Sequence, residues 1–456
     1  MVPDLGVSYG GGAELTGSNA VSSMPWKKPK LSRHKLLVEA YLSLMLFMVV
    51  YCARPEDWIP GLSNIPLAKI AGILALVAFA FSLGKIRQRL PNEVILVILL
   101  TAQLFVTVPM SPVWRGGALN TTLDFAKLVI IVPVMVMAVN TATRLHRLLF
   151  IQAASVATIS AVAVWKGHML GGRLTGVLKG NYSNSNDLAL AIVISLPLCL
   201  ALLFLSRSVS SKIAWAVATL VMAYAVFLTG SRGGFLALAV TTAVCLWEFA
   251  IRGRRIYLLV IVALVSIALC LSSNRMLSDR LKSTFDSEND VASAYGSAEQ
   301  RQHLFWRSLE VTLEHPLFGV GPGNFPIISD SWLVTHNSYT QMSSEGGIPA
   351  LVLYVMVLWA GFKNLRRTRK LSGTNKEAKL FAGALHASLA GFVVGSLFAS
   401  CAYQFFPYFL VAYTTVLLRI AKEQAARSAR VEPAEQTIPE GVHVAATESE
   451  LSGLAY

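Results

Sequence analysis

Long apolar segments follow one another along most of this 456-residue chain, and they constrain its fold more than any other feature. A helix that crosses a lipid bilayer needs roughly 17–25 predominantly apolar residues. Twelve segments are candidates by this rule, which predicts an all-α integral membrane protein. They are residues 36–52, 67–84, 94–110, 122–139, 148–165, 188–205, 213–229, 234–250, 256–272, 347–363, 380–400 and 404–418.

The composition indicates the same class. Hydrophobic residues make up 54% of the chain and charged residues only 14%, whereas a soluble domain has about 25% charged residues. We therefore interpret the net charge of +14 as a topological signal, and we expect no nucleic-acid partner. The five cysteines show neither metal-ligand nor disulfide spacing, so they are expected to act as small apolar residues.

The distribution of Lys and Arg predicts the orientation. Suppose that the basic N-terminus is cytoplasmic. The cytoplasmic side then consists of the N-terminus, every second link and the C-terminal tail. These segments carry 26 of the 39 Lys and Arg residues, as the positive-inside rule requires. The predicted organisation is a disordered basic N-terminus at 1–35, spans one to nine at 36–272, an outer loop domain at 273–346, spans ten to twelve at 347–418 and a disordered cytoplasmic tail at 419–456.

Three polar features then lie on the outer side. The link "SRGG" at 231–234 places Arg232 between two apolar segments, although an arginine at the bilayer centre costs roughly 2.5–3.5 kcal/mol. The loop at 166–187 contains "GGRLTGVLKGNYSNSND", and the loop at 273–346 is much longer than most connections. We therefore expect the chemistry of this protein in these outer loops.

The long outer loop contains a predicted helix, "SAEQRQHLFWRSLEVTLEHPLFG", which the Pro and Gly residues of "HPLFGVGPGNF" end. At 100° per residue, Phe305, Leu309 and Leu313 fall on one face, and Arg301 lies on the same side. Arg307 points elsewhere. We therefore expect that Arg301, and not Arg307, is directed towards the tops of the spans.

The segment "HNSYTQMSSEGG" follows and leads into span ten, which places His336 and Asn337 near the membrane edge. Arg232, Arg301 and His336 are thus predicted to meet in one outer pocket. Two guanidinium groups can grip the oxygens of a diphosphate and stabilise the charge on it as it leaves. A neutral imidazole can accept the proton of an attacking hydroxyl group.

Each residue also has a purely structural interpretation. Arg232 can be an interfacial residue that extends its charge to water, Arg301 a surface residue of a helix, and His336 a solvated loop histidine. The sequence contains no D-x-D motif, so neither a metal ion nor another cofactor is required to hold a diphosphate.

The order of these elements resembles the O-antigen ligase superfamily. The resemblance rests on "RLTGVLKGNYSNSNDLALAIVISLPL", "TGSRGG", "QRQHLFWRSLEVTLEHPLFGVGPGNF" and "HNSYTQMSSEGG", and it covers about residues 165–365. It implies that Arg232 and Arg301 contact the diphosphate and that His336 activates the acceptor. It also implies substrate-binding roles for Arg173, which opens "RLTG", and for Asn337. "NYSNSND" departs from the usual N-P-N form, which leaves the roles of Asn181, Asn184 and Asn186 open.

The resemblance further implies a metal-independent, inverting, GT-C-like glycosyltransferase at the periplasmic face of the bacterial inner membrane. Its donor would be an undecaprenyl-diphosphate-linked glycan, and its most expected acceptor the lipid A–core. The glycines of "SRGG" would leave room for the lipid head group. The alternatives are an O-antigen polymerase, a protein O-oligosaccharyltransferase and, more remotely, a twelve-span transporter or flippase. A transporter would show paired halves and charges at the bilayer midplane, whereas this chain places its polar residues in outer loops.

Overall fold

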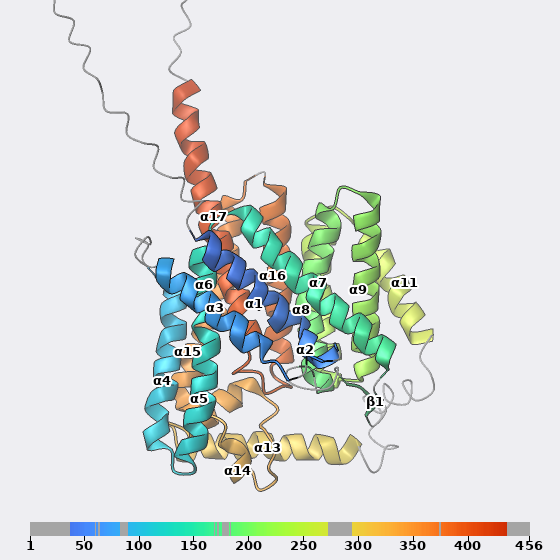
Figure 1. Cartoon of the computed structure of the whole chain (residues 1–456). Coiled ribbons are helices and arrows are strands. Elements are labelled where there is room, and N and C mark those ends of the chain that lie inside the picture. The colour runs from blue at the N-terminus through green and yellow to red at the C-terminus, as the bar shows by residue number, and fades with distance from the viewer. Residues whose placement is uncertain are drawn as a thin grey trace, which may run out of the picture. The chain divides into compact units, whose positions relative to one another are not determined.

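The computed structural model describes residues 37–59, 61–62, 64–82, 90–167, 169–170, 173–175, 182, 184–271, 294–373 and 375–435. The N-terminus at 1–35 and most of the tail, both predicted to be disordered, lie outside these residues. The described residues belong to one compact, almost entirely helical unit, which confirms the predicted all-α membrane class. Its elements (Figure 1) are α1 (Val38–Ala53), α2 (Pro55–Trp58), α3 (Leu67–Ser82), α4 (Asn92–Met110), α5 (Arg115–Val129), α6 (Ile131–Ala138), α7 (Ala142–Lys166), β1 (Met169–Leu170), β2 (Arg173–Leu174), α8 (Ser185–Leu205), α9 (Val209–Thr229), α10 (Arg232–Cys245), the π-helix η3 (Leu246–Ile251), α11 (Tyr257–Leu271), α13 (Ala294–Glu314), α14 (Phe325–Ile328), α15 (Ser338–Leu371), α16 (Lys376–Gly395) and α17 (Phe406–Glu435).

Each of the twelve apolar segments falls on one of these helices or on a consecutive pair of them. Within the part of the chain that the structure describes, nine helical stretches are long and apolar enough to cross a membrane. Two more, Leu67–Phe81 and Tyr257–Ala268, are apolar but shorter. The count of twelve spans therefore stays a prediction.

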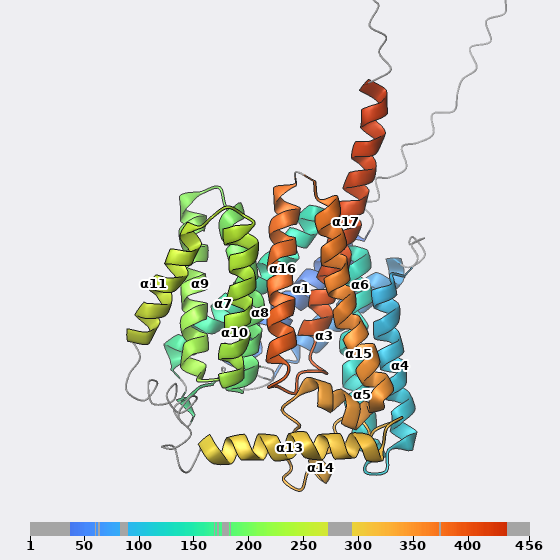
Figure 2. The same ribbon diagram turned by 180° about the vertical axis from the view of Figure 1, so that it is seen from behind.

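Helix α8 lies at the centre of the bundle. It is apolar on all sides, and most of its side chains are buried because it packs against α7, α9, α10 and α16. Helices α9, α10 and α11 lie to one side of it and α4, α5, α6, α15 and α17 to the other (Figures 1 and 2). The N-terminus of α8 thus lies between the two groups of helices.

Helix α13 is the predicted helix of the long outer loop. It crosses below the ends of the upright helices (Figures 1 and 2) and packs against α15. Helix α15 begins at Ser338, before the predicted start of span ten at residue 347, and it is kinked at Gly347, where φ is 78°. Residues 338–346 are therefore a helical arm on the α13 side of the kink.

The C-terminal helix is longer than expected. Helix α17 runs to Glu435, so the prediction that disorder begins at residue 419 is wrong for residues 419–435. This stretch contains several Ala, Glu, Lys and Arg residues, which favour helix even where they bury no apolar face.

Candidate functional site

Arg232 is the first residue of α10. Helix α9 ends at Thr229, Gly230 reverses the chain with φ 55°, and the Ser231 hydroxyl then caps α10 by accepting the Gly234 N–H at 3.1 Å. The Arg232 side chain is exposed at this helix N-terminus. The dipole of α10 favours an anion near its N-terminus, so the helix and the guanidinium attract the same kind of ligand.

The two glycines of "SRGG" serve packing. A Cβ at Gly233 would lie 2.4 Å from the Cβ of Phe398, and a Cβ at Gly234 would lie 2.7 Å from the Cβ of Ala189. Both glycines are buried. The expectation that they leave room for a lipid head group is therefore wrong, because the space beside them is filled by Ala189 of α8 and by Phe398 of the loop after α16.

Arg173 holds this turn in place. Its Nε donates to the Thr229 carbonyl oxygen at 2.9 Å, and its Nη2 donates to Asn186 Oδ1 at 2.8 Å. The same Asn186 oxygen accepts the Ser231 hydroxyl at 2.7 Å. Arg173 and Asn186 thus tie the "RLTG" strand and the start of α8 to the turn that carries Arg232.

The other two asparagines of "NYSNSND" are Asn184 and Asn181. Asn184 caps α8 by accepting the Asn186 N–H at 2.9 Å. Asn181 lies outside the described residues. The Asn186 amide was left without a role by the sequence, and the structure shows it as the point where the outer loop and the "SRGG" turn meet.

Arg301 lies on the side of α13 that faces the bundle, as expected. The residues that form this buried face differ, however, from the predicted ones. The buried face of α13 consists of Leu304, Ser308, Val311 and Thr312, whereas Leu313 is 77% exposed. The predicted face of Phe305, Leu309 and Leu313 is therefore wrong at Leu313, while Phe305 and Leu309 are half-buried beside the buried face. At 100° per residue, Arg301 still falls on the buried face, because it precedes Leu304 by three residues.

Arg307 is directed elsewhere, as predicted. It pairs with Glu310 at 3.2 Å and with Glu314 at 3.6 Å on the surface of α13. Arg301 is partly buried, and burial followed by the charge of Arg232 lowers the pKa of its guanidinium. The group stays protonated because a guanidinium keeps its proton in proteins. Arg301 therefore brings a second positive charge next to Arg232.

His336 comes immediately before the cap of α15 and has a left-handed backbone, with φ 53°. The Thr335 hydroxyl on one side donates to the Asn337 carbonyl oxygen at 2.9 Å, and the Asn337 side chain on the other side accepts the N–H groups of Tyr339 and Thr340. Burial, followed by the charge of Arg301, lowers the pKa of His336 below its ordinary value of 6.5. His336 is thus a partly buried imidazole that is neutral at pH 7.

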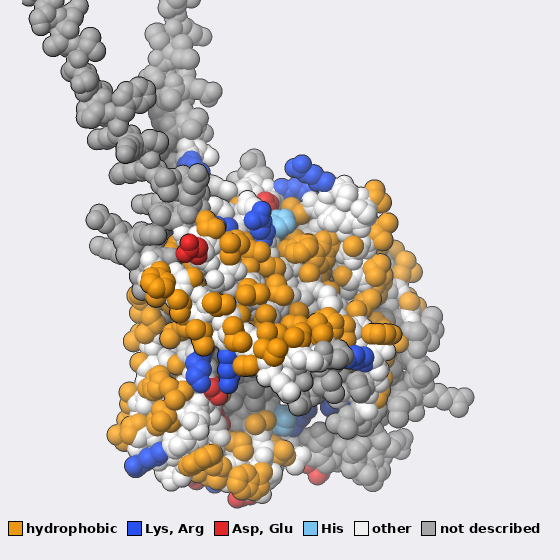
Figure 3. Space-filling model, in the orientation of Figure 1, with side chains coloured by type: hydrophobic (Ala, Val, Ile, Leu, Met, Phe, Trp, Pro, Cys, Tyr) orange, Lys and Arg blue, Asp and Glu red, His pale blue; other side chains and the backbone are white. Residues whose placement is uncertain are grey.

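The three predicted residues therefore lie in one electrostatic environment. Arg232 acts on Arg301, and Arg301 acts on His336. Asn337, in contrast, is 92% buried, and the contacts of its side chain are those of a helix cap. Figure 3 shows a recess between the apolar band of the spans and the lower helices, with histidine and Lys or Arg side chains inside it.

A buried carboxylate fixes the arm that follows His336. Glu345, which is 2% exposed, accepts the N–H groups of Gly323 at 2.9 Å and Phe325 at 3.3 Å, so it binds the "GVGPGNF" turn to the arm. The hydroxyl groups of Thr312 and Ser343 are 2.8 Å apart and join α13 to the same arm. The sequence analysis gave Glu345 no role; an acidic residue between "SS" and "GG" at the start of a span was its signal.

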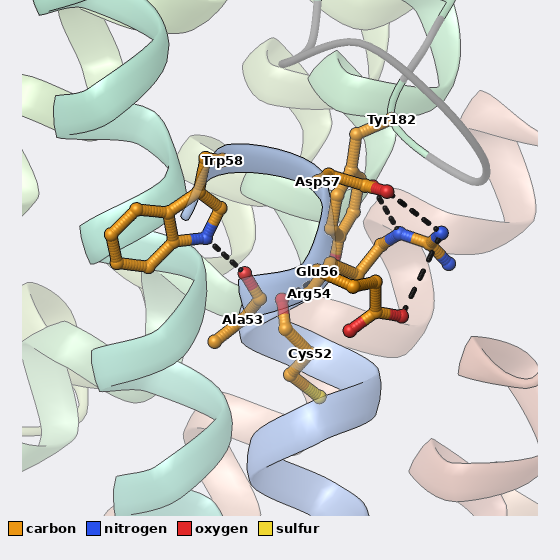
Figure 4. Close-up of polar contacts among 7 residues, drawn as sticks. All are labelled: Cys52, Ala53, Arg54, Glu56, Asp57, Trp58 and Tyr182. Atoms are coloured by element: carbon orange, nitrogen blue, oxygen red, sulfur yellow. Dashed lines mark hydrogen bonds and ion pairs between the residues drawn. The ribbon is translucent and has the colours of Figure 1, made fainter. Parts of the chain in front are cut away.

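The link that follows α1 forms a second polar cluster (Figure 4). Arg54 pairs with Asp57, through Nη2 and Oδ1 at 3.2 Å, and lies 3.9 Å from Glu56. The Tyr182 hydroxyl, from the loop that contains Asn184, donates to the Cys52 carbonyl oxygen at 2.9 Å. This cluster, which the sequence analysis missed, joins the end of α1 to the loop before α8.

Among the described residues, no three His, Cys, Asp and Glu side chains are close enough to hold a metal ion. The prediction that no metal is needed stays a prediction about the chemistry.

Part of the chain matches a known protein family. The model of the O-antigen ligase family matches residues 217–355, which contain Arg232, Arg301, His336 and Asn337, and this confirms the resemblance. No curated protein matches the chain in sequence. A chain from a solved structure of a peptidoglycan synthase complex is similar with a TM-score of 0.40 and 16% identity, covering 73% of this chain and 97% of that chain. A likeness at this level carries no argument.

Proposed function

We propose that this chain, a member of the O-antigen ligase superfamily by its domain at residues 217–355, transfers a glycan from undecaprenyl diphosphate to an acceptor. The family is one of glycosyltransferase-type enzymes. The observation that carries the proposal is the electrostatic neighbourhood of Arg232, Arg301 and His336, which three separate elements bring together within the matched region.

In the proposed reaction, a hydroxyl group of the acceptor attacks the anomeric carbon of the glycan. A glycosidic C–O bond forms, the bond from that carbon to the diphosphate oxygen breaks, and undecaprenyl diphosphate leaves with the bonding electrons. His336 takes the proton of the hydroxyl group, a role that typically contributes 10²–10⁴-fold in rate. Attack from the side opposite the diphosphate inverts the anomeric configuration.

Arg232 and Arg301 act on the leaving group. Negative charge grows on the diphosphate as the bond breaks, and two adjacent guanidinium groups stabilise it more in the transition state than in the ground state. Their mutual repulsion is relieved when a dianionic group lies between them. Burial, followed by the charge of Arg301, lowers the pKa of His336 and so favours the neutral imidazole that accepts the proton.

The proposal also includes the acceptor and the orientation of the protein in the membrane. We place the site at the periplasmic face of the inner membrane, with both termini in the cytoplasm, because Lys and Arg gather at the opposite ends of the spans. The proposed acceptor is the lipid A–core, with polymerisation or protein O-glycosylation as alternatives in the same fold.

The glycans that accumulate in a strain without this gene test the proposal. A ligase predicts long polymers on undecaprenyl diphosphate together with bare lipid A–core. A polymerase predicts single repeats on the carrier. Unchanged lipid-linked and surface glycans would exclude both, and a flippase would leave donors inaccessible to reagents added on the periplasmic side.

A further inference from the structure

Exposed apolar side chains continue beyond the spans onto the turn that follows α13. Leu317 is 60% exposed and Phe318 36%. Ile348, just after the kink of α15, is 43% exposed. We refer to these three side chains as the apolar foot. A single exposed apolar residue needs no explanation, but these three come from two elements that are in contact.

The apolar foot continues the lipid-facing surfaces of two spans. The Ile348 N–H donates to the Pro316 carbonyl oxygen at 2.8 Å, and Gln103 Nε2 of α4 donates to the Leu317 carbonyl oxygen at 3.1 Å. Exposed apolar residues follow from Ile348 along one stripe of α15, and others follow along α4. They are Val352, Val355, Met356 and Trp359 on α15, and Phe105, Val106 and Met110 on α4.

Several polar backbone groups of this turn are paired with protein groups. Gly319 N–H donates to the His315 carbonyl oxygen, and Val320 N–H donates to that of Ser344, both at 2.9 Å. The Val320 carbonyl oxygen accepts the Ser111 hydroxyl, and Gln103 serves both Leu317 and Gly346. Irregular backbone can lie at membrane depth only when its polar groups are satisfied in this way, whereas a turn in water has no such need.

The position of the foot is fixed by close packing. A Cβ at Gly347 would lie 2.4 Å from the Leu317 carbonyl oxygen, and a Cβ at Gly319 would lie 2.4 Å from the Glu345 carbonyl carbon. The positive φ angles at both glycines, 78° and 61°, bring the turn onto the kink of α15. The depth of the foot therefore sets the depth of the end of α13.

We propose that the apolar foot is inserted into the lipid leaflet on the α13 side, where it contacts the acyl chains and glycerol groups of phospholipids. The continuity with α4 and α15 and the paired backbone favour lipid over a protein partner. The foot would anchor the C-terminal end of α13 at a fixed depth. This inference does not rest on the proposed function, because it concerns only the surface of the membrane domain.

Nitroxide accessibility in phospholipid nanodiscs tests the proposal. Four cysteines, Cys52, Cys199, Cys245 and Cys401, are buried, so in a Cys270→Ser background an introduced thiol is the site that a nitroxide reagent labels. Leu317→Cys and Phe318→Cys report on the foot, and each can stand for the other if one variant does not fold. Glu310→Cys is the matched control, because Glu310 is a charged, exposed residue of α13.

We expect the label at Leu317 or Phe318 to collide more with oxygen, which partitions into hydrocarbon, than with a water-soluble nickel chelate. At Glu310 the order should be reversed. Nickel collisions at Leu317 as frequent as at Glu310 would place the turn in water and overturn the proposal. Low collision rates with both reagents would mean that protein covers the foot, from a partner or a second copy, which would overturn it equally.

Discussion

Replacing Arg301 by Gln should move the pH dependence of glycan transfer. His336 must be neutral to accept a proton, so activity is lost as the pH falls through its pKa. Burial and the charge of Arg301 hold that pKa below 6.5. At pH 7.5 the imidazole of the wild-type protein is therefore mostly neutral.

Removing the Arg301 charge takes away a cause that lowers the pKa of His336. The acidic limb of the rate profile should then shift to higher pH, towards the ordinary value, in addition to the loss of rate at the optimum. Initial rates of transfer in nanodiscs between about pH 5 and 8 measure both effects. Arg307→Gln is the control, because Arg307 pairs with Glu310 and Glu314 on the outer surface of α13.

If the acidic limb of the Arg301→Gln variant lies at the same pH as that of the wild type, the charge of Arg301 does not act on His336 in the working protein, and the reasoning is refuted. A limb that persists in His336→Ala would show that another group is the base. The His336→Ala variant itself should lose about 10²–10⁴-fold in rate.

Three further predictions concern binding geometry and packing. Arg301→Lys should lower transfer sharply because lysine cannot grip a diphosphate with two parallel bonds; Arg307→Lys should not, and equal rates of glycan release from both variants would count against the diphosphate role. Gly234→Ala should destabilise the fold by about 1–3 kcal/mol, since the added methyl group overlaps Ala189; an unchanged melting temperature in detergent would contradict this. Tyr182→Phe should lower the free energy of unfolding by about 1 kcal/mol through loss of one buried hydrogen bond, and chemical denaturation checks it.

The sequence predicted the all-α membrane class, for a simple reason. Apolar length alone marks a membrane helix, and the alternation of basic links assigns Arg232, Arg301 and His336 to one side of the bundle. The structure adds that they are electrostatic neighbours.

The features that the sequence did not predict depend on contacts between residues that are far apart in the chain. The buried face of α13 contains Ser308 and Thr312, whose hydroxyl groups bond the α13 backbone and, at Thr312, also Ser343, so counting apolar residues wrongly included Leu313 in that face. The glycines of "SRGG" were assigned to a ligand because the neighbours Phe398 and Ala189 are far away in the sequence.

The most direct test of the central claim is glycan transfer by the purified protein and its Arg232→Ala variant, in nanodiscs of one lipid composition, with a defined undecaprenyl-diphosphate glycan and acceptor. The account predicts a loss of about 10²–10³-fold in turnover, comparable to the removal of one oxyanion-stabilising group, in a variant that remains folded. Undiminished transfer by a folded Arg232→Ala protein would contradict it, because the leaving diphosphate would then be stabilised elsewhere.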